Sequence, residues 1–146
     1  MPQPELIIFV GLQAAGKSTY FRDHLAATHV HVSKDLMKNA RDTNARQLQM
    51  IGDALAAGRS VVVDNTNATP AVRAPLIAAG RRHGARILAY FFETTVKAAV
   101  KRNHGREGKA RVPDVAIYVT ARKLIPPSIG EDFDEVRVIA PLPDNA

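Results

Sequence analysis

The sequence predicts an α/β fold of three layers, in which helices cover a parallel β-sheet of four to five strands. Two observations lead to this fold class: β-prone apolar runs alternate with helix-like segments along the chain, and the first run leads into a glycine-rich loop. Alternation of this kind is typical of strand–helix–strand crossovers in a parallel sheet. With 146 residues and no internal repeat or linker, the chain is expected to form one domain over residues 1–146.

The predicted strands are short and mostly apolar. The run at Glu5–Val10 is continuous, as expected for a strand that is buried on both faces of the sheet. The run at His29–Ser33 instead alternates valine with polar residues. The five predicted strands are Glu5–Val10, His29–Ser33, Ser60–Asp64, Ala85–Phe92 and Val136–Ile139.

The predicted helices have recognisable start and stop signals. Thr69-Pro70 is a cap followed by a first-turn proline, and Gly58 is a natural residue to end the helix before it. Pro75 either kinks the helix in which it falls or shortens its first turn. The predicted helices are Lys17–Ala27, Asn44–Ala57, Thr69–Gly84, a segment capped by Thr94 or Thr95, and Pro113–Leu124.

Composition excludes several classes of function. The hydrophobic content of 46% is that of a globular protein, and the apolar run near the start is far too short to cross a bilayer. The absence of cysteine excludes disulfides, thiolate metal sites and cysteine nucleophiles. We therefore expect a cytoplasmic protein that does not associate with membranes. The net charge of +6 favours a polyanionic partner.

A phosphate-binding loop follows the first predicted strand. The residues from Gly11 to Ser18 match G-x-x-x-x-G-K-[ST] without deviation, between a predicted strand and a predicted helix. The glycines allow backbone N–H groups to turn onto phosphate oxygens, Lys17 is expected to bridge the β- and γ-phosphates, and Ser18 is expected to bind Mg²⁺. The predicted ATP-binding residues of the loop are Gly11, Ala14, Ala15, Gly16, Lys17, Ser18 and Thr19.

Two aspartates follow predicted strands and are expected at the same sheet edge as this loop. Asp64 ends an apolar strand, which is typical of a carboxylate that holds Mg²⁺, although such a residue can also serve as a turn residue. The amides of Asn65 and Asn67 suit contacts to a substrate hydroxyl or phosphate. Asp35 is positioned to accept a hydroxyl proton, and Lys38 to neutralise an acidic group of the substrate.

A basic segment at about 101–113 is predicted to form a helical lid. Arg102 and Arg106 are four residues apart and share a helix face, and glycines at 105 and 108 give the segment mobility. Such a lid would close over a triphosphate and stabilise charge on the transferring group. The alternative is a solvated run of charges. His29 and His31 could share a strand face, but no third ligand at metal spacing accompanies them.

The order of these motifs resembles that of the 5′-hydroxyl polynucleotide kinases, a family of P-loop phosphotransferases. The resemblance extends from Leu6 to about Val138 and includes the phosphate loop, Ser33-Lys34-Asp35, Val63-Asp64-Asn65-Thr66-Asn67 and the lid. It implies that Asp35 is the general base, that the lid arginines contact the donor phosphates, and that the acceptor is the 5′ end of a nucleic acid. Lys38 departs from the arginine that is common in the family and lacks the bidentate guanidinium.

Three functions are compatible with these motifs. The first is an ATP-dependent kinase that acts on the 5′-hydroxyl of a polynucleotide. The second is a small-metabolite kinase of the gluconate or shikimate type, which shares the loop, the strand-end aspartate and the arginine lid. The third is a non-catalytic module in which bound ATP regulates a partner protein. A fold does not distinguish them.

Overall fold

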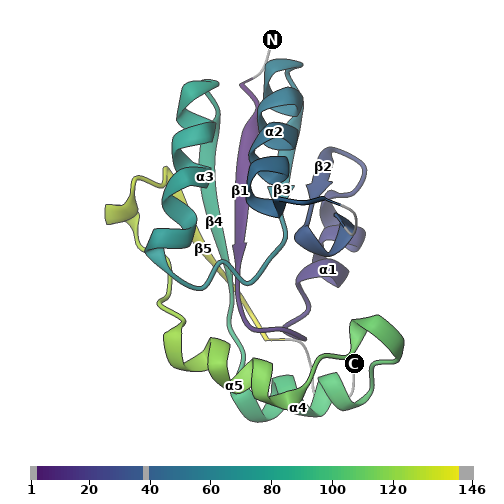
Figure 1. The fold of residues 1–146 in the computed structure, drawn as a ribbon. Coiled ribbons are helices and arrows are strands. Elements are labelled where there is room, and N and C mark those ends of the chain that lie inside the picture. Colours follow the sequence, from purple (N-terminus) through teal and green to yellow (C-terminus); the bar gives the residue numbers. More distant parts are fainter. Residues whose placement is uncertain (1–2, 38–39, 142–146) are drawn as a thin grey trace.

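The computed structural model describes residues 3–37 and 40–141 and contains a sheet of five parallel strands (Figure 1). The predicted fold class is confirmed, because every strand pair is parallel and the order is β2-β3-β1-β4-β5. The strands are β1 (Glu5–Val10), β2 (His29–Val32), β3 (Ser60–Val63), β4 (Arg86–Phe92) and β5 (Glu135–Ile139).

The helices begin close to where the sequence predicts them. They are α1 (Lys17–Tyr20), α2 (Thr43–Ala56), α3 (Pro70–Arg82), α4 (Val96–His104) and α5 (Asp114–Lys123). Thr69 caps α3 through a hydrogen bond from Val72 N, and Thr95, the second of the two candidates, caps α4. Pro75 lies inside α3 and does not end it. Short 3₁₀ turns occur at Lys34–Leu36, Gly108–Ala110 and Ile129–Glu131.

The first helix covers most of its predicted extent but changes form along its length. A helix over Lys17–Ala27 was predicted, but the α-helical part ends at Tyr20 and the chain continues as a π-helical turn over Phe21–Leu25. This wider turn coincides with two consecutive aromatic residues that pack on different strands. Tyr20 makes edge contacts with Phe9 of β1, whereas Phe21 stacks on His31 of β2 at 4.1 Å between ring centroids.

The core has two parts, one on each face of the sheet. Side chains of β1 alternate between them: Leu6 and Ile8 pack with residues of α2 and α3, and Ile7 and Phe9 pack with the aromatic residues that follow the phosphate loop. On the first face α3 lies very close to the sheet, since a Cβ at Gly80 would come within 2.9 Å of side chains of both β1 and β4.

The remaining two helices, α4 and α5, lie beyond the carboxyl ends of the strands, at the bottom of Figure 1. They pack on each other, with Leu12 of the phosphate loop contributing to their shared apolar cluster. These two helices therefore cover the carboxyl edge of the sheet, and the segment predicted as a basic lid, at about 101–113, comprises the end of α4 and the connection to α5. No helix in the described part of the chain is long and apolar enough to span a bilayer.

Candidate active site at the carboxyl edge of the sheet

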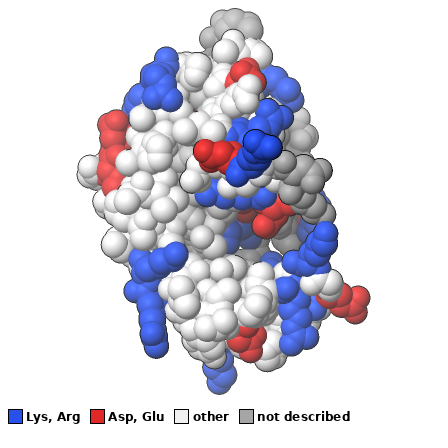
Figure 2. Space-filling model, in the orientation of Figure 1, with Lys and Arg blue, Asp and Glu red and all other residues white. Residues whose placement is uncertain are grey.

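A hollow of about 390 Å³ lies at the carboxyl ends of the strands. On the face shown in Figure 2, acidic atoms are visible within a central depression and basic side chains stand around it. The hollow is lined by Gln13, Ala14, Lys17, Ser18, Thr19, Arg22, Asp35, Asp64, Asn65, Thr66, Arg106, Lys109, Ala110 and Val112. The phosphate loop, both predicted aspartates and one predicted lid arginine therefore meet at one site.

The phosphate loop adopts a backbone that only some residues tolerate. Gly16 has a φ of 94°, and Ala14, which has a side chain, has a φ of 63°. At the start of the loop, Gly11 N donates to Thr66 O at 3.1 Å, and a Cβ on Gly11 would lie 3.1 Å from backbone and side-chain atoms of Phe92. The loop is thus fixed between the segment after β3 and the end of β4.

Lys17 is buried beneath the loop, with 8% of its surface exposed. Its ammonium donates to Gly11 O at 2.9 Å and to Leu12 O at 2.7 Å. Burial lowers the pKa of Lys17 to about 8, although the Asp64 carboxylate acts in the opposite direction. An anion bound in the loop would restore the charged form, so this lysine is arranged to gain stabilisation from a phosphate.

Ser18, Asp64 and His31 form a connected group. The Ser18 hydroxyl donates to Asp64 Oδ2 at 2.7 Å, and His31 Nε2 donates to the same oxygen at 2.8 Å. The Asp64 side chain is 4% exposed. A hydroxyl and a carboxylate at this distance are the oxygen donors that Mg²⁺ prefers, so these residues fit the predicted metal site. No cluster of three His, Asp or Glu side chains suited to a metal occurs among the described residues, so nucleotide oxygens and water would supply the remaining ligands.

Asp35 also lines the hollow, from the 3₁₀ turn after β2. Its backbone N–H donates to Ser33 Oγ at 3.3 Å, and its side chain is exposed. The turn is attached to the end of β3, because Asn65 Oδ1 accepts from Lys34 N at 3.0 Å. The predicted substrate residue Lys38 lies outside the described residues.

The two predicted substrate amides have different surroundings. Asn65 lines the hollow, but its amide nitrogen donates to Gln47 Oε1 at 2.7 Å. Asn67 is 3% exposed and donates to Phe9 O at 2.7 Å, with a φ of 43°. Asn67 therefore has a structural role, because its side chain joins the loop after β3 to β1.

The prediction that Arg102 and Arg106 share a helix face is wrong, because α4 ends at His104 and Arg106 lies beyond it. Arg102 Nη1 donates to Ala14 O at 3.4 Å. Arg106 lines the hollow, where burial lowers its pKa while the Asp35 and Asp64 carboxylates counteract this. The lid segment itself is closed by Asn103, which is fully buried, donates to Val112 O at 2.6 Å and accepts from Val112 N at 2.9 Å.

Sequence reasoning missed two residues of this site. His31 was considered only as a metal ligand, yet it orients Asp64. No local pattern indicated this role, because it depends on the register in which β2 pairs with β3. Gln13, a variable position of the loop motif, donates to Thr120 Oγ1 of α5 at 3.0 Å, and its buried Oε1 has no hydrogen-bond partner among the described residues.

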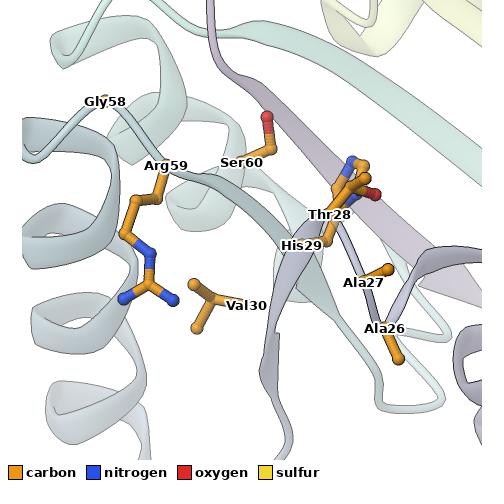
Figure 3. A pocket seen from close by; sticks show the side chains of 8 residues that line it. All are labelled: Ala26, Ala27, Thr28, His29, Val30, Gly58, Arg59 and Ser60. Atoms are coloured by element: carbon orange, nitrogen blue, oxygen red, sulfur yellow. The ribbon is translucent and has the colours of Figure 1, made fainter.

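A second hollow, of about 350 Å³, lies at the opposite end of the sheet. Figure 3 shows its lining, which comes from the segment before β2 and the first residues of β2 and β3. Arg59 is the one Lys or Arg in this lining, and none of the predicted site residues belongs to it. The hollow at the carboxyl edge is therefore the candidate active site.

Comparison with known proteins places this site in a P-loop context. The family described as the AAA domain matches residues 6–124. A protein of Acanthamoeba polyphaga mimivirus, to which a bifunctional polynucleotide phosphatase/kinase activity is ascribed by name, is 26% identical over 142 residues. That match covers 92% of this chain and 33% of the relative, so the chain spans about a third of the length of the curated relative it matches.

Two solved structures have the same fold. A fungal RNA kinase superposes with a TM-score of 0.74 at 15% identity, covering 98% of this chain and 40% of that one. A gluconokinase from Sinorhizobium meliloti 1021 superposes with a TM-score of 0.67 at 19% identity, covering 99% of this chain and 87% of that one. At these identities the likeness concerns the fold, which hosts kinases of different acceptors.

Proposed function

Because this chain belongs to the AAA domain family of P-loop proteins, we propose that it is an ATP-dependent kinase that phosphorylates the 5′-hydroxyl end of a polynucleotide. One observation carries the proposal. The phosphate-loop lysine, the Ser18–Asp64 pair, Asp35 and the lid residue Arg106 line a single hollow. This arrangement provides a donor site, a general base for the acceptor hydroxyl and cationic groups around the same reacting centre.

The donor phosphates occupy the loop in this proposal. Backbone N–H groups of the loop and the ammonium of Lys17 bind the phosphate oxygens, and Arg102 and Arg106 contact them from the lid side. Ser18 and Asp64 hold Mg²⁺, which supplies charge neutralisation on the phosphate oxygens when bound. The role of His31 is to fix the Asp64 carboxylate through its hydrogen bond to Oδ2.

The donor base has an adjoining place to bind. A small, partly apolar hollow adjoins the phosphate loop at Gly16 and Thr19 and is bordered by the rings of Tyr20, His24 and Phe92. An aromatic lining of this kind suits a purine ring, which presents two apolar faces and a polar edge. A nucleotide with its phosphates in the loop could place its base there.

The chemical step transfers one phosphoryl group. The acceptor oxygen forms a bond to the γ-phosphorus, the bond from that phosphorus to the β,γ-bridging oxygen breaks, and ADP leaves. The proton of the acceptor hydroxyl passes to the carboxylate of Asp35. Arg106 lies near both carboxylates of the site and stabilises the charge on the transferring group.

The acceptor assignment is supported by charge and by relatives. The lid side of the hollow carries Arg106 and Lys109, and the chain as a whole has a net charge of +6. A nucleic acid is also the substrate named for the mimiviral relative and for the fungal structure. The second candidate is a small-metabolite kinase, which the likeness to the gluconokinase favours.

The test is a transfer assay with γ-labelled ATP and a panel of acceptors. The panel contains 5′-hydroxyl DNA and RNA oligonucleotides, the matching 5′-phosphorylated oligonucleotides as controls, nucleoside 3′-monophosphates and sugars. We expect label on the 5′-hydroxyl oligonucleotides and none on the 5′-phosphorylated controls. Labelling of a sugar with no labelling of any oligonucleotide would replace the proposal with the metabolite-kinase alternative.

A further inference from the structure

A trough of about 240 Å³ adjoins the candidate active site along the loop after β3. It shares Asn65 and Thr66 with the lining of the main hollow, so the two depressions border the same loop. The trough is lined by Lys34, Asn65, Thr66, Asn67, Ala68, Thr69, Val72 and Lys123. A polynucleotide whose 5′ end lies at Asp35 could therefore extend into this trough.

The trough is electropositive. Among the residues that the structure describes, its only charged lining residues are Lys34 and Lys123, and no acid lines it. Among the described residues neither lysine takes part in an ion pair or a side-chain hydrogen bond. The amino end of α3, a helix of 13 residues, also opens onto the trough through Thr69 and adds its positive dipole end. Two free ammonium groups around a groove favour an anionic occupant.

Helix α5 connects the trough to the main hollow. Gln13 of the phosphate loop donates to Thr120 Oγ1 and, at 3.5 Å, to Ala116 O, so this face of α5 is turned toward the site. Lys123 follows Thr120 by three residues and Val119 follows Ala116 by three, which places both on the same side of the helix. Val119 is 51% exposed, so an apolar contact surface stands beside the lysine.

Resting on the proposed function, we propose that this trough binds the acceptor strand beyond its first nucleotide. Lys123 and Lys34 contact the phosphodiester that follows the second nucleotide, and the exposed apolar surface of α5 contacts a base. The enzyme therefore prefers a 5′-hydroxyl oligonucleotide to a nucleoside 3′-monophosphate, which cannot reach the trough. The occupant is single-stranded, because a base can contact the α5 surface only when it is unpaired.

The test compares acceptor length in two charge-reversal variants. Lys123→Glu is measured beside Lys97→Glu, a matched control on the exposed surface of α4. With an oligonucleotide of about ten residues, we expect Lys123→Glu to raise KM by about tenfold or more relative to the control. With a nucleoside 3′-monophosphate, both variants should keep the KM and kcat of the wild type. Equal effects of Lys123→Glu on the long and the short acceptor, or no effect on either, would overturn the proposal.

Direct binding separates this proposal from the function on which it rests. Fluorescence anisotropy with a labelled 5′-hydroxyl oligonucleotide needs no transfer, and Lys123→Ala should lower the slope of log affinity against log salt by about 0.7. If the wild type transfers phosphate to no oligonucleotide yet Lys123→Glu weakens binding more than Lys97→Glu, the trough stands and the proposed function fails. If both variants bind like the wild type, the trough assignment fails, whatever the transfer assay shows.

Discussion

At the scale of the single residue, Lys17 shows how this site is prepared for an anion. The loop places its ammonium against two carbonyl oxygens and buries it, so dipoles supply the direct contacts to its charge. Burial is the largest influence and lowers the pKa to about 8, whereas the carboxylates of Asp64 and Asp35 act in the opposite direction. A phosphate would supply the negative charge that the folded protein alone does not bring into direct contact.

This arrangement predicts proton uptake on nucleotide binding at alkaline pH. Lys17 is largely protonated below about pH 8 in the free protein and loses its proton above it, whereas bound phosphate holds the proton in place. The dissociation constant of a non-hydrolysable ATP analogue should therefore be flat below this pH and rise by up to about tenfold per pH unit above it. Titration calorimetry in buffers of different ionisation enthalpy should detect proton uptake near pH 8.5. No uptake there would mean that Lys17 does not bind the phosphates.

Also at the residue scale, the contribution of His31 could not be predicted from the sequence. The motif identified Ser18 and the strand end identified Asp64, because both belong to patterns that are local in the chain. His31 contributes only because β2 pairs with β3 in one particular register and because Phe21 supports its ring. The strand register and the packing of the ring are features of the tertiary structure, and the periodicity and motif spacing of the sequence do not specify them.

At the scale of the element, the lid depends on a single buried amide. Asn103 at the end of α4 exchanges two hydrogen bonds with the backbone of Val112, so it closes the segment that carries Arg106 into a loop. The nearby pair of His104 and Asp114 spans the same ends but is half-exposed. Buried hydrogen bonds contribute more than exposed ion pairs, so Asn103 should define the lid.

We predict that Asn103→Ala loosens the lid while leaving the rest of the fold intact. Hydrogen exchange of the amides between residues 104 and 112 should become faster, phosphoryl transfer should slow by about tenfold or more, and the protein should lose about 1–3 kcal/mol of stability. His104→Ala is the matched control, with an effect of at most about 1 kcal/mol. Equal exchange and equal rates in the two variants would contradict this role of Asn103.

Helices and strands whose sequence signals lie within a few residues were predicted most accurately. Strand β1 and the start of α3 were predicted to within a residue, because an apolar run and a Thr-Pro pair act within a few residues. The π-helical turn over Phe21–Leu25 was missed, since the segment has ordinary helical composition. At this turn two neighbouring aromatic rings pack on different strands, and only the assembled sheet determines that packing.

At the scale of the whole molecule, a buried arginine joins two segments that lie far apart in the sequence. Arg73 of α3 is fully buried, donates to Asn67 O at 2.8 Å and forms a bidentate pair with Glu131 at 2.8 and 2.9 Å. Burial opposes the charge of Glu131, but hydrogen bonds from Arg73 and from Ser128 N outweigh it and lower the pKa. The loop beside the active site and the segment before β5 are thereby held by one side chain.

We predict that Arg73→Met destabilises the protein by about 3–5 kcal/mol, because it leaves a carboxylate without its partner at a poorly solvated site. The double variant Arg73→Met with Glu131→Gln should recover part of this loss. Since the pKa of Glu131 is lowered by folding, its contribution is present above its ordinary value of 4.5 and is lost as the pH falls below it. Urea unfolding at neutral pH and at acid pH measures both effects, and a single variant as stable as the wild type would contradict the account.

The whole arrangement also explains why one edge of the sheet carries the chemistry. Parallel strands bring the phosphate loop, Asp64 and the turn with Asp35 to one end, and α4 and α5 cover that end. The central claim is that Asp35 serves as the base for phosphoryl transfer to a 5′-hydroxyl. It lines the hollow from the turn after β2 and is not part of the phosphate loop, so its loss should affect the acceptor step far more than donor binding.

The most direct test of this claim is single-turnover transfer from γ-labelled ATP to a 5′-hydroxyl oligonucleotide by Asp35→Asn, with binding of a non-hydrolysable ATP analogue measured on the same preparation. We predict a loss of transfer of about 10²–10⁴-fold, with the dissociation constant of the analogue within about threefold of the wild type. Transfer at the wild-type rate by a variant that binds the analogue normally would contradict the account.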